Sequence, residues 1–120
     1  MNYHYKKEFS LVLRNGKKKH TIRTRSIAPG KMLKHIIYPY QPEKRECVLI
    51  NICVSTQSIV INPSAESINE GKVWIDGRLL GIGEMQQLAW NDGFPSMVSF
   101  WGYFTEPTKG YIIHWTDLRY

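Results

Sequence analysis

Residues 46–61, ECVLINICVSTQSIVI, contain the clearest strand pattern in the chain and decide the fold class. Side chains along a strand point alternately to opposite faces. Both faces here are largely apolar, with Val48, Ile50, Ile52 and Val54 on one side and Cys47, Leu49, Asn51 and Cys53 on the other. A strand that is apolar on both faces is typical of the centre of a sheet. The polar residues 55–58 predict a bulge or bend before residues 59–61 resume the strand.

Shorter strand patterns lie on both sides of this segment, separated by turn residues such as Pro29-Gly30 and Asp76-Gly77. Pro39 and Pro42 break one of them, which places its end at a sheet edge or in a loop. The first and last strands can pair only if the chain closes on itself. We expect these additional strands at residues 20–25, 31–40, 72–75, 78–80 and 111–118.

Helical patterns occupy the remaining apolar stretches. Residues 84–91 place Met85, Leu88 and Ala89 on one face, and residues 96–104 carry a strongly amphipathic stripe. That stripe, which we expect in the core, consists of Met97, Phe100, Trp101 and Phe104. Residues 9–15 are compatible with a short helix that ends just before Gly16, although their alternation leaves a strand as a rival interpretation.

The order of these elements predicts an α+β fold, a small mixed β-barrel with short flanking helices. The chain has 120 residues, which suits one domain spanning residues 1–120. Its hydrophobic content of 42% is sufficient for a core and argues against disorder. The formal charge of +6 favours a polyanionic partner.

Other features narrow the class of protein. Cys47 and Cys53 are too far apart along one strand for a disulfide, so we expect two separate reduced thiols, as in an intracellular protein. No secretory signal and no membrane span is visible, which predicts a cytoplasmic protein. The sequence contains no phosphate-binding loop, dinucleotide fingerprint or close metal-ligand pair, so we expect no cofactor and no metal.

A basic segment, NGKKKHTIRTR at residues 15–25, holds the main candidate functional residues. A turn glycine is followed by three lysines, a histidine and an alternating strand, so a loop delivers cations and one hydroxyl to the start of a strand. Such a cluster suits an anionic or polar ligand, and nucleic acid is the obvious candidate. A solvated basic loop without a ligand is the alternative. The candidate ligand-binding residues are Lys17, Lys18, Lys19, Thr21, Arg23 and Arg25.

Several stretches together resemble the ASCH domain, a family of the PUA-like β-barrel superfamily. They are NGKKKHTIR at residues 15–23, the Pro29-Gly30 turn, LAWNDGF at residues 88–94, and Ile113-His114-Trp115 in the closing strand. The resemblance covers nearly the whole chain, with residues 62–80 and the first residues more variable. The second half resembles a subgroup of small phage and bacterial proteins.

The resemblance implies a barrel with a cleft that binds RNA or a nucleobase derivative. Some members of the family are small amidohydrolases that remove the acetyl group from N4-acetylcytidine, using a lysine, a threonine three residues later and an acidic residue. Lys18 and Thr21 take the first two positions here, and Arg23 takes that of an arginine which follows the threonine. Asp92 falls closest to the acidic position, where those members carry the longer glutamate.

These residues have a coherent chemical interpretation. Thr21 becomes a nucleophile only if a neighbouring amine with a lowered pKa accepts its proton, and the charges of Lys17 and Lys19 would lower the pKa of Lys18. Asp92 would orient Lys18 or transfer a proton to the leaving amine. Each residue also has an ordinary interpretation, as an exposed loop charge, a strand residue, and a turn residue before Gly93.

Aromatic and histidine residues add weaker indications. Tyr38, Tyr40 and Trp115 flank charged or turn residues and could stack on unpaired bases. His114 is expected to be a structural hydrogen-bonding residue, whereas His20 and His35 have no partner that the sequence reveals.

The leading hypothesis is therefore a binding module for nucleic acid, above all RNA, or for a nucleobase derivative. One alternative is an amidohydrolase that deacylates N4-acylated cytidine nucleosides, with Lys18, Thr21 and Asp92 as catalytic residues. The other is a phage-type protein-interaction or inhibitor protein. Whether the chain is an enzyme is left open by the sequence.

Overall fold

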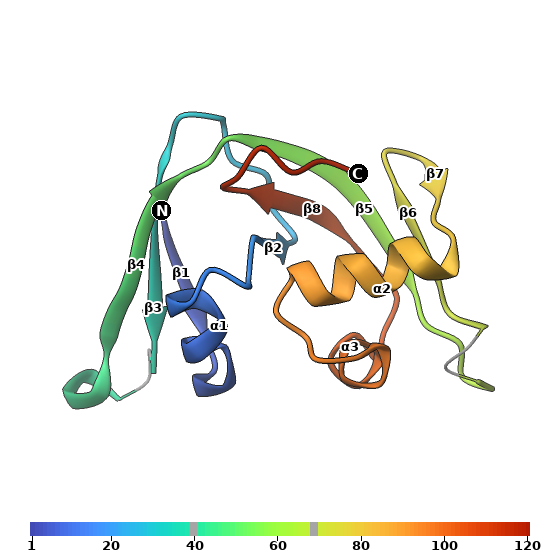
Figure 1. Ribbon diagram of the computed structural model, residues 1–120, viewed down its shortest axis with the longest axis horizontal. Coiled ribbons are helices and arrows are strands. Elements are labelled where there is room, and N and C mark those ends of the chain that lie inside the picture. The colour runs from blue at the N-terminus through green and yellow to red at the C-terminus, as the bar shows by residue number, and fades with distance from the viewer. Residues whose placement is uncertain (39–40, 68–69) are drawn as a thin grey trace.

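A computed structural model describes residues 1–38, 41–67 and 70–120 of the chain (Figure 1). Within these ranges the fold is mixed α+β, with two sheets and three short α-helices. The first sheet has the order β1-β3-β4 and consists of β1 (Asn2–Tyr5), β3 (Met32–Ile37) and β4 (Glu46–Ile52). The second has the order β2-β8-β5-β6-β7 and consists of β2 (His20–Arg23), β8 (Thr108–His114), β5 (Ser55–Asn62), β6 (Lys72–Ile75) and β7 (Arg78–Leu79).

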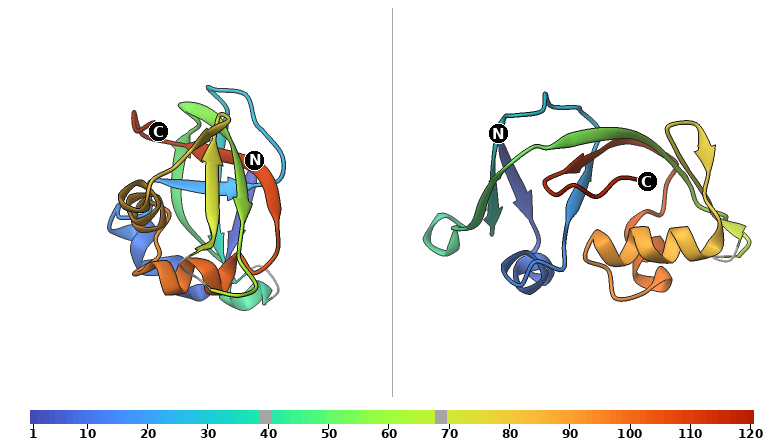
Figure 2. Two further views of the ribbon diagram at one scale, coloured as in Figure 1. Left: turned by 90° about the vertical axis from the view of Figure 1, so that its right-hand side faces the viewer. Right: turned by 45° about the horizontal axis from the view of Figure 1, so that its top comes forward.

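β4 and β5 form one continuous arch that crosses from the first sheet to the second (Figures 1 and 2). The crossing lies between two adjacent residues. The backbone N–H of Cys53 donates to Lys31 O at 2.9 Å, at the end of the first sheet, and the next N–H, that of Val54, donates to His114 O at 2.8 Å, in the second. The chain therefore passes from the first sheet to the second at residues 53–54. The bend was predicted slightly later, at residues 55–58, which instead form the start of β5.

The prediction of one central strand over residues 46–61 is consequently wrong. Residues 46–61 form two strands, of which β4 lies at the edge of its sheet and β5 has a strand on each side. Ile50 and Ile52 are more than half exposed, since one face of β4 is not covered. The apolar residues on both faces predicted that both faces would be buried. The face of β4 that carries Ile50 and Ile52 stays exposed, because the chain leaves for the second sheet.

The first and last predicted strands pair with each other, but the predicted closed barrel is not found among the described residues. β2 lies antiparallel to β8, with His20 opposite His114, so the first predicted strand is joined to the last (Figure 1). Backbone ladders among the described residues nevertheless form two separate sheets rather than one closed ring. β1, which the sequence did not indicate, lies parallel to β3 and contributes to the first sheet.

Strand ends differ from the predicted ones. β8 begins at Thr108 and ends at His114, so residues 115–118 leave the sheet. β2 ends at Arg23 and β3 at Ile37, where Tyr38 has a positive φ of 59°. Pro39 and Tyr40 lie outside the described residues. The Asp76-Gly77 turn joins β6 to β7 as predicted, with positive φ at both of its residues.

The helix predictions are confirmed. A 3₁₀ turn, η1 (Lys7–Phe9), leads into α1 (Ser10–Arg14), which excludes the rival strand interpretation of residues 9–15. A second turn, η2 (Pro42–Lys44), follows β3. α2 (Ile82–Asn91) and α3 (Met97–Tyr103) lie together on one side of the second sheet, and the Ser96 hydroxyl caps α3 by accepting from Ser99 N.

The core lies between the strands and these helices. It contains Phe100, Trp101 and Phe104 from the predicted stripe, together with Leu88 and Ala89 of α2. The largest fully buried apolar side chains from the strands and α1 are Leu13, Leu33, Ile37, Ile59, Ile61, Ile75, Ile112 and Ile113. Cys53 is buried and Cys47 exposed, and both are free thiols as predicted. None of the described helices has the length and apolar character needed to cross a membrane.

Candidate functional site

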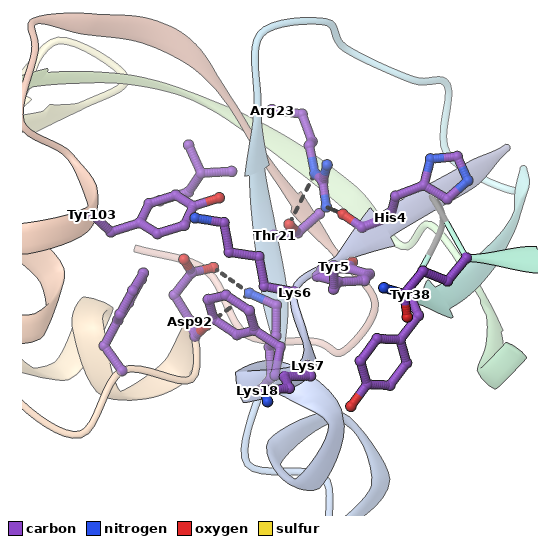
Figure 3. Close-up of a pocket in the computed structure, with 14 residues that line it drawn as sticks. His4, Tyr5, Lys6, Lys7, Lys18, Thr21, Arg23, Tyr38, Asp92 and Tyr103 are labelled. Atoms are coloured by element: carbon purple, nitrogen blue, oxygen red, sulfur yellow. Dashed lines mark hydrogen bonds and ion pairs between the residues drawn. The ribbon is translucent and has the colours of Figure 1, made fainter. Parts of the chain in front are cut away.

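A pocket of about 440 Å³ opens between β1, the start of β2 and the loop that joins α2 to α3 (Figure 3). Lys18, Thr21, Arg23 and Asp92 all line it, although Asp92 is 74 positions away from Lys18 in sequence. The sequence predicted these four as site residues, and the fold brings them to one cavity. Aromatic side chains complete the lining, namely Tyr5, Phe9, Tyr38, Phe94 and Tyr103.

Lys18 is buried, with only 2% of its surface exposed, and it points into the pocket. Its Nζ donates to the backbone O of Asp92 at 2.7 Å and to the carboxylate Oδ1 of the same residue at 3.2 Å. The ammonium also lies 4.8 Å from the centre of the Phe9 ring and 5.6 Å from that of Tyr5. The interpretation of Lys18 as an exposed loop charge is therefore wrong.

Burial lowers the pKa of Lys18, because an ammonium away from water loses its hydration. The Asp92 carboxylate opposes this shift by attraction and hydrogen bonding, while the charge of Arg23 adds to it. The predicted cause was the charge of Lys17 and Lys19, but both of these side chains are exposed and neither lowers the pKa. Desolvation, rather than neighbouring charge in the sequence, perturbs this amine.

Asp92 reaches Lys18 because the backbone itself approaches the amine. It follows α2 and precedes Gly93, which has a φ of +95°. A Cβ at Gly93 would lie 2.9 Å from Val12 Cγ2 and 3.4 Å from Lys18 Cβ, so a glycine allows the loop to pack directly on Lys18. The short aspartate side chain is therefore long enough to reach Lys18 Nζ.

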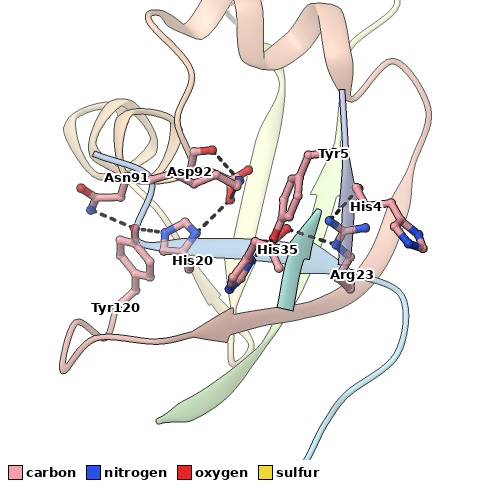
Figure 4. Close-up of polar contacts among 10 residues, drawn as sticks. His4, Tyr5, His20, Arg23, His35, Asn91, Asp92 and Tyr120 are labelled. Carbon is pink, nitrogen blue, oxygen red and sulfur yellow. Dashed lines mark hydrogen bonds and ion pairs between the residues drawn. The ribbon is translucent and has the colours of Figure 1, made fainter. Parts of the chain in front are cut away.

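His20 extends the site behind Asp92 (Figure 4). Its Nδ1 lies 3.0 Å from Asp92 Oδ1, and its Nε2 lies 2.6 Å from the Tyr120 hydroxyl. Asn91 Nδ2 donates to that hydroxyl at 3.0 Å, so the hydroxyl proton of Tyr120 is free to point to His20 Nε2. His20 is then neutral and donates from Nδ1 to the carboxylate. Burial lowers its pKa, against the opposing effect of Asp92, in agreement with the neutral form.

Arg23 is held at the rim of the pocket by β1 and β2. Its Nε donates to Thr21 Oγ1 at 3.1 Å, and its Nη2 donates to His4 O at 3.3 Å. The guanidinium stands 4.8 Å from the ring centres of both Tyr3 and Tyr5. Thr21 and Arg23 therefore lie on the same face of β2, and the half-buried guanidinium keeps further N–H donors for a ligand.

A second polar cluster lies on the β1–β3 side of the pocket (Figure 4). The Tyr5 hydroxyl is 2.8 Å from His35 Nδ1, and His35 Nε2 is 2.8 Å from Asn51 Oδ1. Burial lowers the pKa of His35 to about 4, so this histidine is neutral. Burial also raises the pKa of Tyr5. Trp115, predicted to stack on bases, instead packs on His35 with 4.5 Å between ring centres.

The basic segment divides in two. Lys18, Thr21 and Arg23 line the pocket, whereas Lys17, Lys19 and Arg25 are exposed and do not. Lys17 Nζ lies 5.4 Å from the ring centre of Trp90, in a neighbouring groove that Leu11 and Val12 of α1 also line. His114 Nε2 donates to Gln57 Oε1 at 3.0 Å, which is the structural role predicted for His114.

Sequence reasoning missed His20, Tyr120 and Tyr5. The partners of His20 are 72 and 100 positions away, so local sequence patterns give no signal for them. No cluster of three or more histidine, cysteine, aspartate or glutamate side chains suited to a metal ion occurs in the described part of the chain.

No protein-family profile matches the chain, and no curated protein or solved structure matches it either. The resemblance to the ASCH family stays a prediction from the sequence, and the geometry of the pocket carries the functional inference.

Proposed function

We propose that the pocket around Lys18 binds a nucleobase or a nucleoside derivative. The observation that carries this proposal is that aromatic side chains and the buried Lys18 amine, held in place by Asp92, line one cavity of about 440 Å³. This volume lies within the range of small-molecule sites, which are mostly apolar with a few convergent polar groups. The rings of Phe9, Phe94 and Tyr103 offer faces or edges for a planar base, and Arg23 offers N–H donors to its ring and carbonyl acceptors.

The resemblance to the ASCH family supports the same ligand class. We infer that the two sheets correspond to a PUA-like barrel that is open between β1 and β2, where the pocket lies. The pairing of β2 with β8, which brings the basic segment beside the end of the chain, agrees with this interpretation.

Isothermal titration calorimetry with a panel of nucleosides, including cytidine, N4-acetylcytidine, uridine and adenosine, tests the proposal. Arg23→Ala should weaken binding about tenfold or more, because it removes charged donors from the pocket. Arg25→Ala is the matched control, since Arg25 is exposed, two residues further on, and outside the pocket. A panel in which no member binds, or equal losses in both variants, would contradict the proposal.

Amide hydrolysis is a second candidate function, favoured by the buried Lys18 amine with its lowered pKa. Thr21 Oγ1 would attack the acyl carbonyl carbon while neutral Lys18 accepts the hydroxyl proton. The same proton would pass to the departing amino group, and water would then hydrolyse the acyl ester on Thr21. Both described hydrogen bonds of Lys18 Nζ go to Asp92, so this step requires Nζ to turn toward Thr21 when a ligand is bound.

Chromatography of N4-acetylcytidine incubated with the protein separates binding from hydrolysis. A hydrolase releases cytidine and acetate, and Lys18→Ala or Thr21→Val should abolish the release. Lys19→Ala is the control, because this neighbouring side chain is exposed and should keep full turnover. Tight binding without conversion would leave the binding function and reject hydrolysis of this substrate.

A further inference from the structure

A second groove of about 570 Å³ adjoins the pocket around Lys18. The two cavities share three aromatic side chains, Phe9, Phe94 and Tyr103, so a common wall separates them. On its other side the groove is lined by α1 and by the end of α2. The groove therefore lies next to the proposed ligand site, and its remaining lining includes Lys17 as well as residues of α1 and the end of α2.

The groove exposes large apolar and aromatic surface. Trp90 is 49% exposed, although it follows the buried residues Leu88 and Ala89 in α2. Tyr103 is also about half exposed, and Leu11 more so. Aromatic faces that remain open beside a ligand pocket are the surfaces on which unpaired bases stack.

Cations stand next to these aromatic rings. Lys17 Nζ lies 5.4 Å from the ring centre of Trp90, and Lys6 Nζ lies 5.6 Å from that of Tyr103. Glu8 contributes one opposing charge to the lining. Open aromatic rings with lysines beside them match the bases and phosphates of a single-stranded nucleic acid, which alternate along its chain. An apolar peptide would use the same rings but not the lysines.

We propose that this groove holds a second nucleobase, stacked on Trp90, of a single-stranded nucleic acid whose neighbouring base occupies the pocket around Lys18. The inference rests on the proposed function, and it makes the ligand an oligonucleotide rather than a free nucleoside. Lys17 contacts the phosphate on the groove side. The division of the basic segment follows from this arrangement, because Lys18 serves the first base and Lys17 serves the second.

Fluorescence anisotropy with a labelled RNA tetranucleotide, and calorimetry with the nucleoside it contains, test the inference together. The wild type should bind the tetranucleotide more tightly than the nucleoside. Trp90→Ala should weaken tetranucleotide binding roughly tenfold, the typical effect of losing one stacked base. The same variant should leave nucleoside binding unchanged, because Trp90 does not line the first pocket.

Two further variants exclude general effects. Ile50→Ala removes an exposed apolar side chain from the outer face of the first sheet and should leave binding of both ligands unchanged. Lys17→Ala should lower the dependence of log affinity on log salt by about one for the tetranucleotide, because one phosphate contact is lost.

The outcomes separate this inference from the proposed function. Nucleoside binding with no gain for the tetranucleotide, or a tetranucleotide affinity that Trp90→Ala does not change, overturns the second subsite and leaves the first. Tetranucleotide binding that depends on Trp90, without any nucleoside binding, supports the groove and contradicts the first pocket. Preference for an apolar peptide over the tetranucleotide also overturns the inference.

Discussion

Two buried histidines, His20 and His35, lie beside the pocket, and each contacts a tyrosine hydroxyl (Figure 4). Only His20 also forms a hydrogen bond to a charged group, the Asp92 carboxylate. In the Asp92 cluster, formed by Lys18, His20, Asp92 and Tyr120, the histidine lies between a tyrosine hydroxyl and a carboxylate. In the His35 cluster, formed by Tyr5, His35 and Asn51, it lies between a tyrosine hydroxyl and a neutral amide.

The difference indicates what each cluster does. A buried carboxylate requires hydrogen-bond donors, and Asp92 Oδ1 accepts from both Lys18 Nζ and His20 Nδ1. Neutral partners such as Asn51 only satisfy hydrogen bonds, so the His35 cluster orders the wall formed by β1, β3 and β4. We therefore expect changes in the Asp92 cluster to alter the chemistry of Lys18, and changes in the His35 cluster to alter stability alone.

Asp92→Asn should have the largest effect on stability. Lys18 would be buried without its opposing charge, and breaking a buried pair in this way typically costs about 3–5 kcal/mol. Urea denaturation at neutral pH measures the loss. Adding Lys18→Met to this variant should recover part of it, because an apolar side chain of similar length needs no counter-charge. A loss well under 1 kcal/mol would show that the ammonium is solvated.

Acidification should destabilise the fold through the neutral histidines. Burial holds the pKa of His35 and of His114 at about 4, below the ordinary value of 6.5, so the unfolded chain binds more protons between these values. Their contribution is complete above pH 6.5 and is lost as the pH falls toward 4, by up to about 1.4 kcal/mol per pH unit for each. Urea denaturation at several pH values should show a shallower dependence for His35→Gln, whereas exposed His4→Gln should leave it unchanged.

Tyr120→Phe should cost about 1–3 kcal/mol, since it leaves His20 Nε2 and the Asn91 amide without their common partner. His20 would then be free to change its tautomer and its hold on Asp92. We expect the titration of Lys18, followed by NMR of the side-chain ε carbon, to shift as a result. An unchanged titration would confine Tyr120 to a structural role.

Asn51→Ala tests the same point from the other cluster. It removes the acceptor of His35 Nε2 and should cost about 1 kcal/mol, with no change in the Lys18 titration. A shift in that titration comparable to the shift in Tyr120→Phe would remove the distinction between the clusters.

Lys19→Ala should have the smallest effect, within about 0.5 kcal/mol in chemical denaturation, because this side chain is exposed. Its neighbour Lys18 is buried, so comparing alanine variants of the two lysines measures how much burial changes the contribution of a lysine to stability. A large loss in Lys19→Ala would indicate that the whole basic segment is structural.

The sequence predicted the helices, most strands and the candidate site residues Lys18, Thr21, Arg23 and Asp92, but not that these four meet in one pocket. Local periodicity is sufficient for the first two, and the resemblance to a known family supplied the third. The sequence-based prediction failed where the structure depends on contacts between distant segments of the chain. Alternation over residues 46–61 does not reveal that Cys53 and Val54 donate to different sheets. Three consecutive lysines look alike, although the loop buries the middle one.

The antiparallel pairing of β2 with β8 also has a kinetic consequence. It joins His20 to His114, so a large loop must close before the two strands can stabilise each other. Contacts this distant slow folding. Lys18 and Asp92 are themselves 74 positions apart, so the contact that forms the pocket also requires a large loop to close. A ligand that bridges them would bind the completed chain in preference to partly folded forms, and would thereby slow unfolding as well as occupy the site.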